Sequence, residues 1–135
     1  MTISAIKEEQ QKKVDDLLKE KNVFFAFSQS QFEEGKTPLA EGENYVKIGG
    51  GGYMPKNGAK AFYEEMQNIE IWFNDRMKDP ELRRENIRYE LENHEAYYTG
   101  EIEATADALG DDYTNEEIWK VFRMEQAKTE WSSFL

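Results

Sequence analysis

The helical character of this chain is clearest in residues 58–78, which read GAKAFYEEMQNIEIWFNDRMK. Apolar side chains recur there every three or four positions, a spacing that places them on one stripe of an α-helix. Asn57 precedes the stretch and is a residue type that caps helix N-termini. We therefore predict one continuous amphipathic helix over residues 58–78. The side chains expected in the core are Phe62, Met66, Ile69 and Phe73.

Further helix signals follow downstream. Asp79 can cap a helix that has Pro80 at its first position and that we expect to run to about Tyr98. Its apolar stripe is Ile87, Leu91, His94 and Tyr98. We expect a short helix over residues 102–109, and Thr114 begins a capping box that opens a last helix to about Trp131.

The N-terminal part mixes a helix with short strands. Residues 3–21 carry a helical stripe, whereas residues 23–27 (VFFAF) and 44–48 (NYVKI) have the aromatic content or the alternation of strands. Tyr53-Met54 is a candidate third strand, and Ser28 or Ser30 can cap a short helix before it.

These signals predict an α+β fold that is mostly helical. We expect about five helices and a small antiparallel sheet of two or three strands from residues 23–54. The 135 residues show no internal repeat and no linker, so we predict one domain over residues 1–135.

Composition excludes several classes of function. The chain has no cysteine and one histidine, so a disulfide framework, a thiol nucleophile, a Cys-based metal site and a His-rich metal site are excluded. The net charge of −11 disfavours direct binding of nucleic acid or of anionic membranes and favours a basic protein partner. No apolar run approaches the roughly 20 residues of a membrane span, and the first residues lack a signal-peptide pattern.

Four consecutive glycines, Gly49 to Gly52, suggest a phosphate-binding loop at first sight. A Walker loop ends in Gly-Lys-Ser/Thr at the start of a helix, and Gly58-Ala59 does not fit that ending. We interpret the run as a tightly bent hairpin, with a backbone surface that a partner approaches closely as the alternative.

No residue set supports catalysis or a cofactor. Glu90 and His94 are four apart, as metal ligands or an acid–base pair would be, but no second histidine or cysteine completes such a site. We expect a partly buried histidine bonded by a local carboxylate or carbonyl. The aspartates around Gly110 lack the alternating spacing of a calcium loop, and no Gly-x-Ser-x-Gly motif is present. We therefore predict no catalytic residue, no metal and no cofactor.

The segment between Arg88 and Lys120 holds ten acidic residues and no lysine or arginine. One interpretation is a solvated face that keeps the protein in solution, and the other is a docking surface for a basic groove with tyrosines as anchors. The residues predicted to bind a partner are Glu90, Glu92, Glu95, Tyr97, Glu101, Glu103, Asp107, Asp111, Asp112 and Tyr113.

Several segments resemble a group of small uncharacterised acidic proteins of bacteriophages and bacterial mobile elements. They are YELENHEAYYTGEIE at 89–103, ALG at 108–110, YT at 113–114, FFAFS at 24–28 and QFEEG at 31–35. The resemblance covers most of residues 23–123. It implies an accessory gene, a setting in which small acidic proteins often inhibit host defence, in the manner of anti-CRISPR and anti-restriction proteins.

These observations lead to one favoured function and one alternative. We expect a cytoplasmic, non-catalytic inhibitor that binds a basic host enzyme of nucleic acids through its acidic, tyrosine-bearing surface. The alternative is a structural or regulatory phage accessory protein that forms a homodimer or a larger oligomer.

Overall fold

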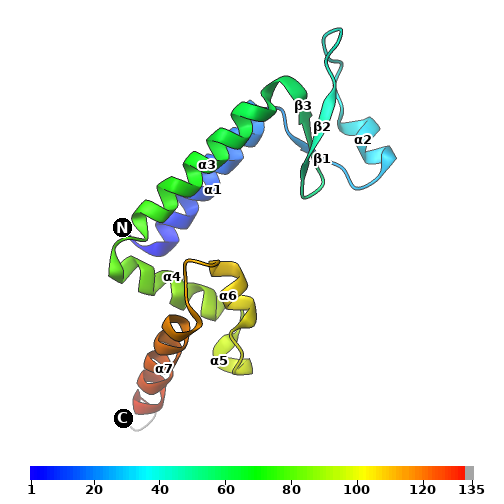
Figure 1. Cartoon of the computed structure of the whole chain (residues 1–135). Coiled ribbons are helices and arrows are strands. Elements are labelled where there is room, and N and C mark those ends of the chain that lie inside the picture. The colour runs from blue at the N-terminus through cyan, green and yellow to red at the C-terminus, as the bar shows by residue number, and fades with distance from the viewer. Residues whose placement is uncertain (133–135) are drawn as a thin grey trace. The chain divides into compact units, whose positions relative to one another are not determined.

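The computed structural model describes residues 1–132 and has a mostly helical α+β fold (Figure 1). Within these residues the chain forms seven α-helices, one short 3₁₀ helix and a three-stranded antiparallel sheet, so the α+β prediction is confirmed with more helices than expected. The elements are α1 (Ile3–Glu20), β1 (Phe24–Phe25), α2 (Gln29–Gly35), β2 (Tyr45–Gly49), β3 (Gly52–Pro55), η1 (Lys56–Gly58), α3 (Ala59–Arg76), α4 (Pro80–Asn93), α5 (Ala96–Thr99), α6 (Glu103–Leu109) and α7 (Asn115–Ser132).

The contacts of the chain group into two compact units. The N-terminal unit comprises residues 4–75, and the C-terminal unit comprises residues 1–3 with the described chain from Arg76 on. Each unit has its own cluster of buried apolar side chains. We therefore describe the two units separately.

In the N-terminal unit the helices α1 and α3 lie side by side (Figure 1). Lys13 of α1 places its ammonium nitrogen 5.0 Å from the centroid of the Trp72 ring of α3. At the sheet end, Leu17, Met54 and Phe62 form a buried cluster. The helix predicted over residues 58–78 is confirmed as α3, with its bounds shifted inward.

The prediction that four α3 side chains are buried is confirmed for Phe62, whereas the other three are less buried than expected. Phe62 is 5% exposed, whereas Met66, Ile69 and Phe73 are only half-buried. Met66 and Ile69 nonetheless pack against the cluster of Leu17, Met54 and Phe62.

The sheet has the strand order β1-β3-β2. Tyr53 of β3 lies opposite Phe24 of β1 and Lys47 of β2, so these three side chains share one face. Met54, the next residue, points to the other face and into the buried cluster with Leu17. The three predicted strands are confirmed with different bounds: β1 is reduced to two residues, β2 is shifted by one residue, and β3 is extended at both ends.

The glycine run forms the turn between β2 and β3, as the hairpin interpretation predicts. Gly49, Gly50 and Gly51 have φ values of 91°, 57° and 81°. L side chains rarely adopt such angles, so glycine is the residue that the turn requires here.

In the C-terminal unit α4 packs against α6 and α7. The shared core joins seven buried side chains, Ile87, Leu91, Ala96, Ile102, Ile118, Val121 and Phe122. The predicted caps are present: the Asp79 side chain accepts from the backbone N–H groups of Glu81 and Leu82, and Thr114 Oγ1 accepts from that of Glu117 at 3.1 Å.

The prediction of one helix from residue 80 to Tyr98 is wrong. The chain leaves α4 after Asn93, and Glu95 adopts a left-handed conformation with φ of 54° before the short α5 begins. The break rotates the following residues away from the stripe of Ile87 and Leu91. Tyr98 is therefore 93% exposed rather than part of that stripe.

Candidate partner-binding surface

Glu90 belongs to the interior of the C-terminal unit rather than to its surface. The residue is 8% exposed, and its Oε2 lies 3.3 Å from His94 Nε2. Its backbone carbonyl accepts a hydrogen bond from Thr105 Oγ1. His94 is thus the half-buried histidine beside a local carboxylate that the sequence predicts.

Tyr97 is packed against the core. Its ring stacks on Phe122 with a centroid distance of 5.1 Å and an interplanar angle of 17°. Its hydroxyl oxygen is buried and has no hydrogen-bond partner in the described part of the chain. Burial, with smaller contributions from the charges of Glu125 and Glu92, raises the pKa of Tyr97 to about 12.

Tyr113 holds the loop before α7 against α4. The Arg83 guanidinium lies 3.9 Å from the centroid of its ring, and its hydroxyl accepts a hydrogen bond of 3.1 Å from Asn86 Nδ2. Tyr97 and Tyr113 therefore have structural contacts, and neither stands out from the surface as a free anchor.

The other seven predicted residues are exposed carboxylates, and Glu116 joins them. Within residues 1–132 none of the eight forms a salt bridge, although Glu117 and Glu125 of the same unit are paired with Arg83 and Arg88. We call these eight residues the acidic surface: Glu92, Glu95, Glu101, Glu103, Asp107, Asp111, Asp112 and Glu116.

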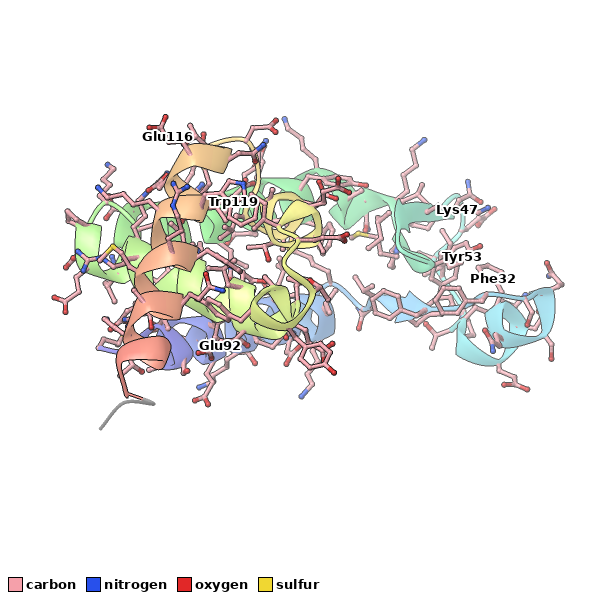
Figure 2. The ribbon with its side chains drawn as sticks, turned by 90° about the horizontal axis from the view of Figure 1, so that it is seen from below. Phe32, Lys47, Tyr53, Glu92, Glu116 and Trp119 are labelled. Atoms are coloured by element: carbon pink, nitrogen blue, oxygen red, sulfur yellow. The ribbon has the colours of Figure 1, made fainter. Side chains whose placement is uncertain are left out.

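The acidic surface extends around the C-terminal unit instead of forming one small patch. Figure 2 shows Glu116 and Glu92 on opposite sides of this unit, with Trp119 between them. Glu103 and Asp107 are four residues apart on α6 and so share one helix face. A partner that contacts the α6 side would therefore meet only part of the surface.

Sequence reasoning missed the most exposed aromatic side chain of this segment. Tyr98 is 93% exposed and lies between Glu95 and Glu101, whereas the neighbouring Tyr97 faces the core. Consecutive residues in a helix point in different directions, so a Tyr-Tyr pair carries one inward and one outward ring. The helix break at Glu95 decides which ring points outward, and the sequence pattern did not reveal that break.

Two features are absent from the described part of the chain. No three histidine, cysteine, aspartate or glutamate side chains that the structure describes gather in an arrangement that could hold a metal ion. In the same residues no helix combines the length and the apolar character needed to cross a bilayer.

Comparison with known proteins shows a match to a protein family. The model of a family described as a family of unknown function, DUF7659, matches residues 4–133. No curated protein and no solved structure matches the chain. Because the family model covers nearly the whole sequence, the chain belongs to the DUF7659 family.

Proposed function

We propose that this protein is a non-catalytic binding protein that docks onto a basic surface of another protein through its acidic surface. The observation that carries the proposal is the set of eight exposed carboxylates that have no salt bridge within the described chain. Other carboxylates of this unit make its paired contacts: Glu90 with His94, Glu117 with Arg83 and Glu125 with Arg88.

The energetics of like charges support this proposal. Unpaired carboxylates on one small unit repel one another and lower its stability. A partner that brings lysine and arginine side chains removes the repulsion and is drawn in from a distance. The exposed ring of Tyr98 adds an amphipathic contact of the kind that is enriched at protein interfaces.

The partner class that we propose is a host enzyme that binds nucleic acid. Its groove carries the positive charge that matches phosphates, and carboxylates can occupy the same positions. The resemblance to phage and mobile-element proteins suggests the form of such a function: inhibition of a CRISPR or restriction enzyme in the bacterial cytoplasm.

The test compares three baits in a pull-down from bacterial lysate with mass spectrometry. They are the native chain, the variant Glu101→Lys/Glu103→Lys/Asp107→Lys, and a control with the same change in net charge, Glu8→Lys/Glu41→Lys/Glu64→Lys. All six positions are exposed and form no salt bridge with the described residues. Far-UV circular dichroism checks that both variants remain folded.

We expect a basic nucleic-acid-binding protein on the native and control baits that is lost from the first variant. Its affinity should fall steeply with added salt, since screening acts over about 10 Å at 0.1 M ionic strength. Equal retention by all three baits would show that the acidic surface only keeps the protein in solution. Self-association without a basic partner, measured by analytical ultracentrifugation, would favour the structural or regulatory alternative.

A further inference from the structure

The N-terminal unit contains a hollow that the proposed function does not use. It has a volume of about 540 Å³ and lies where β2, β3 and the segment before α2 meet. Three aromatic side chains, one lysine and the glycine turn line it, and no carboxylate does. The residues that matter for its chemistry are Phe27, Phe32, Lys47, Gly51 and Tyr53.

Two of the aromatic rings are held rigidly. Phe32 and Tyr53 contact each other edge to face at a centroid distance of 4.9 Å. Figure 2 labels both residues at this end of the N-terminal unit. Phe24 stacks on Tyr53 at 5.7 Å with an interplanar angle of 20°. Gly35 makes room for Phe24, because a Cβ at position 35 would lie 2.4 Å from Phe24 Cδ2.

The third ring, Phe27, lies against the glycine turn and is otherwise exposed to solvent. The residue is 77% exposed, yet its ring lies so close to Gly51 that a Cβ there would be 2.3 Å from Phe27 Cε1. Its backbone N–H donates a hydrogen bond of 2.7 Å to Gln31 Oε1. A large apolar ring in such an exposed position is available to pack against a ligand.

The charge of the Lys47 side chain determines whether the hollow favours an anionic or a cationic ligand. Lys47 is exposed and has no ion-pair partner in residues 1–132, and its Nζ lies 6.0 Å from the centroid of the Tyr53 ring. A cluster of rings alone would suit a cation, but the ammonium group of Lys47 would repel one. An anionic group would instead find a partner in Lys47.

We propose that this hollow binds a small molecule in which a flat aromatic ring is joined to an acidic group. The ring packs against Phe27 and Tyr53, and the acidic group pairs with Lys47. The volume lies within the range of small-molecule sites, and the side-chain-free turn at Gly49 to Gly52 leaves the approach open. Nucleoside monophosphates and aromatic carboxylic acids share this chemistry. The site is independent of the acidic surface.

The test is a titration of the full-length, ¹⁵N-labelled protein followed by NMR, with four probes. Adenosine 5′-monophosphate and indole-3-acetate carry a ring and an acid, adenosine carries the ring alone, and inorganic phosphate carries the anion alone. We expect at least one of the two ring-plus-acid probes to shift the amide signals of Phe27 and Gly51 at millimolar concentration. It should bind at least fivefold tighter than adenosine or phosphate.

Two variants and two matched controls separate the contributions. Lys47→Gln should weaken the binding of the charged probe at least fivefold and leave adenosine unchanged, whereas Phe27→Ala should weaken both. The controls Lys56→Gln and Phe25→Ala change an exposed lysine and an exposed phenylalanine of the same unit that do not line the hollow.

The titrations distinguish the two classes of ligand from each other, and they also include results that would contradict the proposal. Preference for the monophosphate indicates a nucleotide, and preference for indole-3-acetate indicates an aromatic carboxylic acid. If neither ring-plus-acid probe shifts the amide signals at about 10 millimolar, a concentration well above a millimolar dissociation constant, the proposal is wrong. Equal losses in Lys47→Gln and Lys56→Gln would also overturn it, because the attraction would then be non-specific.

Discussion

Arg83 on α4 and Glu117 on α7 form a bidentate ion pair across 34 positions of the chain. Arg83 Nε donates to Glu117 Oε1 at 2.6 Å, and Nη2 donates to Oε2 at 3.0 Å. Nη2 also donates to the backbone carbonyl of Asp112 at 2.6 Å, and the guanidinium covers the Tyr113 ring. One side chain thus fastens the start of α7 and the loop before it to α4.

Replacement of Arg83 by lysine should therefore destabilise the C-terminal unit even though the charge is kept. Lysine cannot make the bidentate contact or stack on Tyr113. Since both partners are about one-third exposed, we expect a loss of about 1 kcal/mol in the free energy of unfolding, measured with urea. Arg84→Lys is the control, because Arg84 is exposed and makes no ion pair in the described chain. Equal losses in the two variants would contradict this assignment.

The same pair predicts an acid-dependent loss of stability. The hydrogen bond from Arg83 lowers the pKa of Glu117 below its ordinary value of 4.5. The contribution of the pair is therefore complete above pH 4.5 and is lost as the pH falls through the lowered pKa. Glu117→Gln should be less stable than the native chain at pH 7, and the difference should shrink below pH 4.5. A difference that is constant with pH would be inconsistent with this pairing.

Removal of the Tyr97 hydroxyl should leave the protein as stable at pH 7 or more stable, by up to about 1 kcal/mol. The hydroxyl is buried without a partner in the described residues, and Tyr97→Phe keeps the stack on Phe122. Because the pKa is raised from 10.0 to about 12, the native chain should lose stability relative to the variant as the pH rises from 10 through 12. A marked loss in Tyr97→Phe at pH 7 would show that the hydroxyl has a bonding partner.

Alanine at Gly51 should destabilise the N-terminal unit more than alanine at Gly50. Both positions have positive φ, but only at Gly51 would the new Cβ collide with the Phe27 ring. Strain at such a φ costs about 1 kcal/mol at either site, and the collision adds to it at Gly51. Thermal unfolding should show partial recovery in the double variant Gly51→Ala/Phe27→Ala. Without that recovery, the contact between Phe27 and Gly51 would not be the cause.

Truncation of Phe62 and of Phe73 should separate the buried part of α3 from its half-buried part. Phe62→Ala removes a ring that is 5% exposed and should cost about 3–5 kcal/mol. Phe73 is half-buried, with the Lys7 ammonium 5.5 Å from its ring centroid, so Phe73→Ala should cost about half as much. Similar losses in the melting temperature for both variants would contradict the burial difference.

Local sequence signals determined most of the secondary structure. Helical spacing identified α3, the caps Asp79 and Thr114 identified the starts of α4 and α7, and the glycine run identified the hairpin. These features depend on neighbours within a few residues, so the sequence contains the information directly. The acidic character of the segment from Glu90 to Glu117 was equally visible.

The tertiary structure alone decided which of those residues face solvent. Glu90 and Glu92 are both glutamates of α4, but only Glu90 points to the interior, where His94 and Thr105 contact it. The turn at Glu95 likewise directs the Tyr97 ring toward the core and the Tyr98 ring toward solvent. The pairing of β1 with β3 brings the residues that follow β1 close to β2 and β3. Phe27 and Phe32 therefore line the hollow beside Lys47. Such arrangements depend on packing between distant segments, whose energies local spacing does not encode.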